Sequence, residues 1–395
     1  MGKGTMKKSI SKILTAFSLI SALFFSSCDG VIFYTIRDEV ELDDAEISGD
    51  IAKVVRYQLD GVENVFVANG KIYCRSVDTA HDASGNDVEF TDSVANSKID
   101  WTTFAKPNGI VYDLAADSQY LYAVAIIYDD DDDGYNVPTT RTVYCYDSSS
   151  SSWTSIFSAT YSSSVSSRLF CTNAPKNDNR KAYFRYGSDI YELNGTAQLG
   201  DDVAAGFVYA TTDNASVGTF TTTEDSSSTA LNPLSCAYFN GTVYFTALYA
   251  MTTNETLDDE AAYIYYATGD NVYYSTDASA WTAVDLSCDT ILSLAVTQNY
   301  LIAGTDEGVV HTTYATKAEN DVGGIPTAGT ADFDTNADST LSSYYEVNSV
   351  LVIDPSLGEY DGTIYASIDM SGTSASLNNI GLWSYYAYKG KWNRE

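Results

Sequence analysis

Residues 271–284, NVYYSTDASAWTAV, decide the fold. Two runs rich in Val, Tyr and Thr flank a short polar segment, which predicts a β-hairpin whose second strand begins at Trp281. Similar polar turns precede Trp101, Trp153 and Trp392. A large ring in this place can cover the hairpin beside it and bury on the order of 200 Å². Its recurrence therefore predicts a repeated structural unit.

A second kind of hairpin precedes most of these units. It has an apolar strand, a tight polar turn and a second strand that opens with an aliphatic or aromatic pair, and copies begin near residues 65, 111, 168, 234, 292 and 350. The spacing is near that of four-stranded propeller blades. The sequence thus predicts an all-β fold, a six-bladed β-propeller of four-stranded antiparallel blades, with seven blades as the alternative. The Ser/Thr-rich segment 204–232 favours a loop over an extra half-blade.

The amino terminus has the layout of a secretory signal. Residues 6–28, MKKSISKILTAFSLISALFFSSC, combine a basic start with an apolar run too short to span a membrane. Because the run ends at a cysteine, it resembles a bacterial lipoprotein signal, in which Cys28 becomes the lipidated first residue; an ordinary signal peptide is the alternative. We therefore expect a signal peptide at 1–27, a lipid-anchored tether with a closing strand at 28–49, and one propeller domain at 50–395.

The lipoprotein resemblance also implies a location. The protein would be membrane-anchored in a bacterial cell envelope, at the outer membrane or on the periplasmic face of the inner membrane. The charge of the chain limits which kinds of partner it can bind. It has 21 basic and 53 acidic residues, for a net charge of −32. Such a charge repels nucleic acid and attracts cations and basic partners.

Five cysteines follow Cys28, each inside an apolar, strand-like run. No Cys-x-x-Cys pair or Cys/His cluster indicates zinc, and an odd number at irregular spacing is not a disulfide framework. Buried thiols are the favoured interpretation, with one or two disulfides as the alternative. The residues are Cys74, Cys145, Cys171, Cys236 and Cys288.

Within the opening stretch, Ser275, Asp277 and Trp281 resemble an Asp-box, the Ser-x-Asp-x-Gly turn followed by Trp of BNR-like repeats in sialidase-like and photosystem-assembly propellers. Ser279 stands at the usual Gly position. In that family the turn is a structural element on the rim of the ring. The resemblance therefore implies a structural role and assigns no catalytic residue.

One hairpin is strongly acidic. Residues 128–138, YDDDDDGYNVP, place Asp129, Asp131 and Asp133 at alternate positions before Gly134 and resemble the calcium hairpins of integrin-type propellers. The later acidic ligands of that motif are missing, since Val137 and Thr140 stand there. Bound Ca²⁺ and a solvated acidic run both remain open.

The function classes follow from what the sequence contains. Only His81 and His311 occur, no motif supports a nucleophilic relay, and no catalytic residue is predicted. Long polar connections at 129–140, 250–262 and 369–380 are expected to form an acidic binding face. The favoured function is a non-catalytic, lipid-anchored envelope propeller that binds a protein, a glycan or a cation there. The alternative is a sialidase-like or other propeller glycoside hydrolase, which needs an arginine cluster at the axis.

Overall fold

The structure is a computed structural model of the 395-residue chain. It describes residues 46–47, 49–76, 101–130, 134–172, 180–200, 205–210, 215–220, 233–246, 251–255, 261–317, 322–329, 331–332, 345–353, 364–370, 380–386 and 391–395. The chain divides into two compact units, and the strands described below belong to the second, Ala45–Asn393 with Glu395. The predicted signal peptide and Cys28 lie outside the described residues.

Every element within the described residues is a β-strand, and these strands form seven sheets. The first sheet contains β1 (Lys53–Leu59), β2 (Val62–Ala68), β3 (Ile72–Ser76) and β4 (Thr102–Phe104). The second contains β5 (Ile110–Ala116), β6 (Leu121–Asp130), β7 (Asn136–Asp147) and β8 (Ser152–Thr160). The third contains β9 (Ser167–Cys171), β10 (Ala182–Tyr186) and β11 (Asp189–Glu192).

The remaining four sheets follow in chain order. The fourth contains β12 (Ala205–Ala210), β13 (Ala215–Phe220), β14 (Ser235–Phe239) and β15 (Thr242–Thr246), and the fifth β16 (Met251–Glu255), β17 (Ala261–Thr268), β18 (Asn271–Ser275) and β19 (Thr282–Asp285). The sixth contains β20 (Ile291–Val296), β21 (Tyr300–Thr305), β22 (Gly308–Thr316), β23 (Ile325–Pro326) and β24 (Ala331–Asp332). The seventh contains β25 (Tyr345–Val352), β26 (Ile364–Met370), β27 (Gly381–Tyr386) and β28 (Lys391–Arg394).

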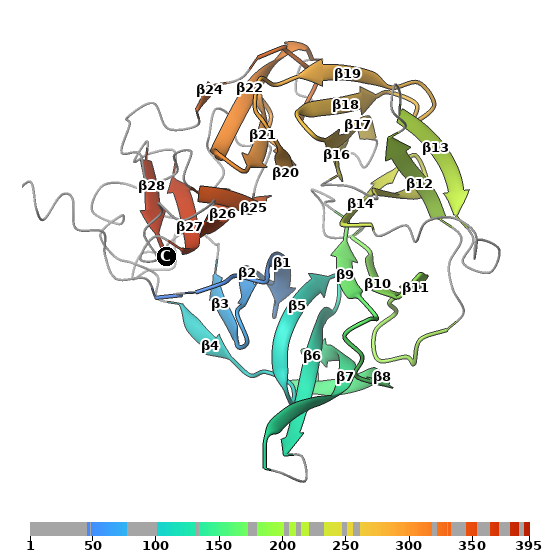
Figure 1. The fold of residues 1–395 in the computed structure, drawn as a ribbon, viewed down its shortest axis with the longest axis vertical. Helices are drawn as coiled ribbons and strands as arrows, with labels where there is room; N and C mark the ends of the chain where they lie inside the picture. Colours follow the sequence, from blue (N-terminus) through green and yellow to red (C-terminus); the bar gives the residue numbers. More distant parts are fainter. Residues whose placement is uncertain are drawn as a thin grey trace, which may run out of the picture. The chain divides into compact units, whose positions relative to one another are not determined.

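One edge strand of each sheet lies at the middle of a ring (Figure 1). These inner strands contact one another in the order β1, β5, β9, β14, β16, β20 and β25, and β25 contacts β1 again. A closed ring of small twisted sheets is a β-propeller. The propeller prediction is confirmed, with seven sheets in place of the favoured six, so the seven-bladed alternative is the right one.

The favoured blade number was wrong because segment 204–232 is not a simple loop. It contributes β12 and β13, the two outer strands of the fourth sheet. β12 pairs in parallel with β15, whereas the other registered pairs are antiparallel. The third sheet has three described strands. The blades are therefore less uniform than the predicted four-stranded antiparallel unit.

The connection predicted at 250–262 also differs, because β16 occupies part of it as the innermost strand of the fifth sheet. In the hairpin of Asn240 and Gly241, the φ angles are 47° and 82°, the positive values that a two-residue Asn-Gly turn requires. The turn at Asn69 is different: it joins β2 to β3 by three residues, and Gly70 exchanges backbone hydrogen bonds with Val111 of the next sheet. The innermost hairpin of the first sheet turns at Asp60 and Gly61 instead.

The core lies between neighbouring sheets. Among the side chains that are almost completely buried, the largest are aromatic and include Trp383, Tyr57, Tyr122, Tyr265 and Phe66. Two neighbouring sheets approach each other closely at Gly304 of β21, in the sixth sheet. A Cβ there would lie 2.4 Å from Ser293 Oγ of the same sheet and 2.4 Å from Val347 O of the seventh sheet. A glycine is thus required where the sixth and seventh sheets pack.

The recurring tryptophans lie where the repeat predicted them, at or just before the start of the fourth strand of a sheet. Trp153 and Trp392 are in β8 and β28, while Trp101 and Trp281 immediately precede β4 and β19. The five cysteines after Cys28 are all free thiols, and Cys145 and Cys236 are fully buried, as predicted; Cys74, Cys171 and Cys288 are half-buried.

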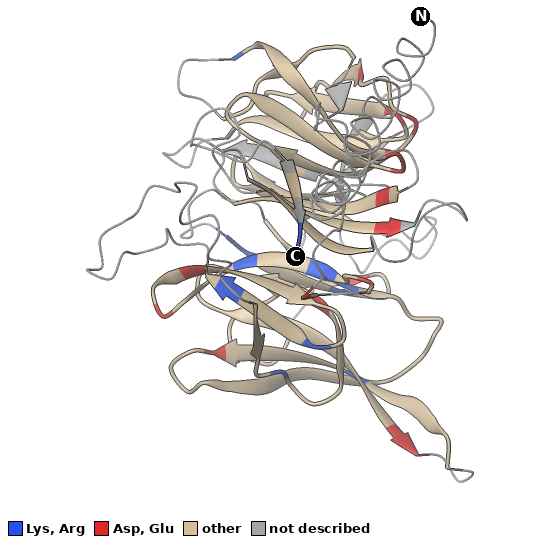
Figure 2. Ribbon diagram, turned by 90° about the vertical axis from the view of Figure 1, so that its left-hand side faces the viewer, with Lys and Arg blue, Asp and Glu red and all other residues tan. Residues whose placement is uncertain are grey.

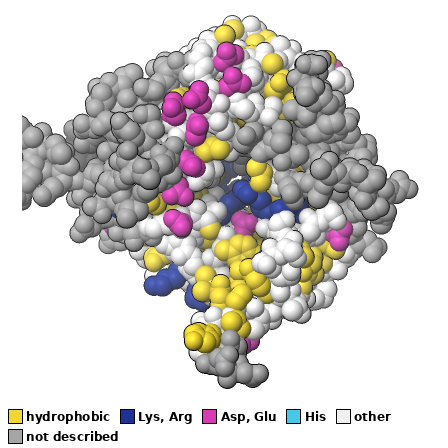
Figure 3. Space-filling model, in the orientation of Figure 1, with side chains coloured by type: hydrophobic (Ala, Val, Ile, Leu, Met, Phe, Trp, Pro, Cys, Tyr) yellow, Lys and Arg dark blue, Asp and Glu magenta, His cyan; other side chains and the backbone are white. Residues whose placement is uncertain are grey.

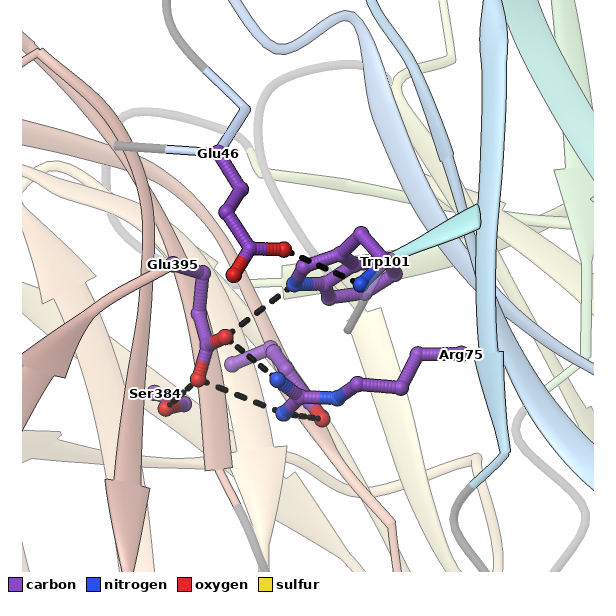
Figure 4. A network of polar contacts seen from close by, with 6 residues as sticks. Glu46, Arg75, Trp101, Ser384 and Glu395 are labelled. Atoms are coloured by element: carbon purple, nitrogen blue, oxygen red, sulfur yellow. Dashed lines mark hydrogen bonds and ion pairs between the residues drawn. The ribbon is translucent and has the colours of Figure 1, made fainter. Parts of the chain in front are cut away.

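Among the described residues, the seventh sheet contacts the first through a buried polar network (Figure 4), and most of the predicted closing strand at 28–49 lies outside them. Glu395 accepts hydrogen bonds from Arg75, from Ser384 Oγ and, at 3.0 Å, from Trp101 Nε1. Arg75 Nη2 also donates to Tyr365 Oη at 2.6 Å. The Glu395 carboxylate therefore joins side chains of both sheets.

Candidate functional site

The opening stretch forms a tightly bonded turn. The Asp277 carboxylate accepts hydrogen bonds from the backbone N–H groups of Ser279 (2.8 Å) and Ala280 (3.0 Å) and from Ser275 Oγ (3.0 Å). These bonds, led by the one from Ser279, lower the pKa of Asp277 below its usual range. Each donor lies in the hairpin itself, so Asp277 stabilises the β18–β19 connection. The arrangement offers no ligand-binding group.

Trp281 packs beside this turn. Its ring lies edge-on to Tyr266, with centroids 5.1 Å apart, and Tyr266 stacks on Tyr273 at 4.8 Å. Tyr266 is fully buried. The three predicted Asp-box residues are thus brought together in one hairpin, where their contacts are structural.

Only part of the predicted calcium hairpin can be placed. Asp129 lies near the end of β6, where its Oδ2 accepts a hydrogen bond from Thr139 Oγ1 at 2.8 Å. Asp131 and Asp133 lie outside the described residues. In the part of the chain that the structure describes, no group of three or more His, Cys, Asp or Glu side chains is arranged to hold a metal ion. The Ca²⁺ site stays a prediction.

Basic side chains gather at the middle of the ring. Seen from the side, many Asp and Glu residues lie at turns and strand ends, whereas several Lys and Arg residues lie within strands (Figure 2). On the face viewed down the axis, Lys and Arg side chains gather beside a central hollow (Figure 3). Three basic residues lie on inner strands, Lys53 and Arg56 on β1 and Arg168 on β9. Arg180 and Arg185, before and within β10, complete what we call the axial basic cluster.

One half of the cluster contains its own counter-ion. Glu63 Oε1 lies 3.5 Å from Arg56 Nε and 3.4 Å from Arg180 Nη2. Arg180 Nη1 also donates to the backbone oxygen of Arg56 at 2.9 Å. One carboxylate is therefore shared by two guanidinium groups, which holds these side chains in place.

The other half is less well neutralised. Arg168 and Arg185 lie directly opposite each other on β9 and β10, although like charges in such a pair repel. Arg185 is only 4% exposed, and Arg168 Nε is buried without a hydrogen-bond partner. No hydrogen bond or ion pair links the side chains of Lys53 or Arg168 to any residue that the structure describes. Two cations are thus held near the axis without a direct partner.

Asp113 of β5 is the nearby carboxylate, and it is 6% exposed. Its Oδ1 accepts from Leu114 N (3.0 Å) and its Oδ2 from Leu169 N (2.7 Å). Burial raises the pKa of Asp113, while the charges of Lys53 and Arg168 act in the opposite direction. Oδ2 joins β5 to β9, whereas Oδ1 accepts from the next residue of β5, and no hydrogen bond among the described residues links Asp113 to Lys53 or Arg168.

The electrostatics of the cations agree with this picture. Burial, followed by the Arg168 charge, lowers the pKa of Lys53, and the same two causes lower the pKa of Arg185. Both effects show positive charges crowded in a partly dehydrated place. Guanidinium and ammonium groups in such a place bind anions strongly, because their hydrogen bonds are charge-assisted.

Sequence reasoning did not find this cluster. The sequence pattern assigned no role to Lys53, Arg56, Arg168, Arg180 or Arg185. The one usable signal was that Lys53 and Arg56 interrupt an otherwise apolar strand of a chain poor in basic residues. Of the two histidines, His311 lies in β22 against the Tyr300 ring, at 5.2 Å between centroids, and His81 lies outside the described residues.

The sequence matches no model of a protein family, and no curated protein matches it. Similar folds occur among solved structures. BBS1N, in a crystal structure of its complex with ARL6DN soaked with mercury, is 13% identical with a TM-score of 0.37, and the match covers 84% of this chain and 95% of that one. Sqt1 of Saccharomyces cerevisiae is 9% identical with a TM-score of 0.40, over 87% and 97%. Likenesses this distant indicate no function, and the propeller assignment rests on the seven sheets.

Proposed function

We propose that this protein is a non-catalytic binding propeller of the bacterial cell envelope, tethered by a lipid on Cys28. Its ligand, an envelope protein or glycan, binds on the ring face at whose centre the axial basic cluster lies. One observation supports this proposal above the others. Lys53 and Arg168 are half-buried near the axis with no hydrogen-bond or ion-pair partner among the described residues. Keeping such charges in a folded protein is costly unless a ligand uses them.

The alternative is a propeller glycoside hydrolase, which the arginines near the axis favour. Hydrolysis also needs a carboxylic acid that reaches the substrate, commonly paired with a second carboxylate. Asp113 is a carboxylate that the charges of Lys53 and Arg168 affect directly. Its two oxygens, however, accept backbone hydrogen bonds. This geometry supports binding over catalysis.

A screen of the purified full chain separates these two classes. It combines a glycan array, capture of proteins from bacterial envelope extracts, and a panel of chromogenic glycosides. We expect a ligand bound without turnover, and weaker binding when Arg168→Gln removes one cation. Turnover of any glycoside that Asp113→Asn abolishes would establish the hydrolase instead.

A further inference from the structure

We infer that the centre of the ring binds a single small oxyanion group, a carboxylate, sulfate or phosphate, through Lys53 and Arg168. This inference rests on the proposed binding function and names the chemistry that the ligand would present there.

The two side chains belong to two different inner strands, which lie on either side of a third inner strand, β5. Lys53 is on β1 and Arg168 on β9, and β5 contacts both strands. The ammonium and the guanidinium therefore come from the two blades on either side of the second blade. The face viewed down the axis is hollowed at its centre, with Lys and Arg side chains beside the hollow (Figure 3). An anion entering from that face would meet donors from two blades.

The charge balance of the cluster calls for an anion. Among the described residues, five basic side chains, those of Lys53, Arg56, Arg168, Arg180 and Arg185, stand against the carboxylates of Glu63, Asp113 and Asp117. Glu63 is already shared by two arginines, and Asp113 by two backbone amides. Lys53 and Arg168 are left to offer donors, and Arg168 Nε is among the buried atoms without a partner. An oxyanion has several acceptor lone pairs and can satisfy both side chains at once.

The overall charge limits the kind of anion. The chain carries a net charge of −32, so a polyanion is repelled along its length before it reaches the centre. A single anionic group is affected mainly by charges within about one Debye length, which is about 8 Å at physiological ionic strength. Near the axis those charges are positive. The site therefore suits a ligand with one isolated anionic group and disfavours polyanions.

Calorimetric titration of the full chain in detergent tests the inference. The probes are sodium acetate, sodium sulfate and sodium phosphate, each compared with sodium chloride at equal ionic strength, and a long polyglutamate as the polyanion. We expect saturable binding of at least one of the three oxyanions. The anion that binds most tightly identifies whether the natural ligand presents a carboxylate, a sulfate or a phosphate. Arg168→Gln and Lys53→Met should each weaken it about tenfold or more, as expected for loss of a charge-assisted hydrogen bond.

Lys181→Gln is the matched control. It also removes one positive charge, but from a pair with Glu192 in which both side chains are 45% exposed. It should leave anion binding unchanged. The Arg168→Gln protein without anion should melt no lower than wild type, because the substitution relieves the repulsion from Arg185, whereas a purely structural arginine would lower the melting temperature.

Three results would overturn the inference: no saturable binding of any oxyanion, equal binding by Arg168→Gln and wild type, or tighter binding of polyglutamate than of the small anions. The outcome is separable from that of the proposed function. A protein or glycan ligand bound equally by wild type and Arg168→Gln would keep the binding function and remove the anion site. Oxyanion binding with no macromolecular ligand would keep the anion site and remove the proposed binding of a protein or glycan.

Discussion

Replacing Glu395 by Gln should open the junction between the seventh and first sheets. Glu395 is 9% exposed, and its carboxylate accepts from Arg75, Ser384 and Trp101. Removing one partner of a buried ion pair costs about 3–5 kcal/mol, because the other charge is left uncompensated. Gln keeps the size and an acceptor oxygen, and Arg75 keeps Tyr365 Oη and the Trp101 ring, whose centroid lies 4.7 Å from its guanidinium carbon. We therefore expect the lower end, about 3 kcal/mol.

Urea unfolding followed by tryptophan fluorescence measures this loss at neutral pH. Glu192→Gln is the matched control, since its ion pair with Lys181 has both side chains 45% exposed and should contribute under about 1 kcal/mol. In a double-mutant cycle, Arg75→Met should remove most of the effect of Glu395→Gln, because the stranded charge is gone. If Glu395→Gln unfolds at the same urea concentration as the control, the network does not hold the ring closed.

The same variant gives a pH test. Burial alone raises the pKa of Glu395, but the Arg75 charge and the hydrogen bonds from Ser384, Arg75 and Trp101 outweigh it, and the pKa lies below its usual value. A carboxyl group with a lowered folded-state pKa stabilises the fold above its unfolded pKa, about 4.3, and loses that contribution as pH falls through the folded value. The difference between wild type and Glu395→Gln should be full at pH 7 and shrink below about pH 4. A constant difference down to pH 2 would contradict the assignment.

Three other changes test separate parts of the molecule. Gly304→Ala should destabilise by about 2 kcal/mol or more, because its Cβ would overlap backbone and side-chain atoms of the seventh and sixth sheets; a melting temperature equal to that of wild type would contradict that packing. Cys28→Ser should abolish lipid labelling and move the protein from detergent phase to soluble fractions. Millimolar Ca²⁺ should raise the melting temperature of wild type over that in chelator, by about 2.7 kcal/mol in stability at a hundredfold excess over Kd. The Asp131→Asn/Asp133→Asn double variant should not respond, and an unresponsive wild type would leave only a solvated acidic run.

The repeat could be predicted from the sequence wherever a hairpin brought its own signals. Trp281 and the turn at Asn240 and Gly241 are local features, in which alternation, turn residues and a large ring all indicate the same structure. The outer strands β12 and β13 have no such agreement, since Ser, Thr, Gly and Ala fill much of the segment that contains them. β12 joins its sheet by pairing in parallel with β15, more than 30 residues later, and a local pattern cannot reveal such a contact. This is why six blades were favoured over seven.

The axial basic cluster was missed for a related reason. β1 reads KVVRYQL, and Lys53 and Arg56 interrupt the apolar pattern that would have marked it as the innermost strand of its sheet. Residues that conflict with their local structural pattern tend to lie at functional or strained sites. The cations of the cluster are spread from residue 53 to residue 185 in a strongly acidic chain, so neither composition nor spacing brings them together. Only closure of the ring does so, because it places β1 and β9 on either side of β5. The two basic residues that hid the strand therefore belong to the cluster through which we propose the ring binds its ligand.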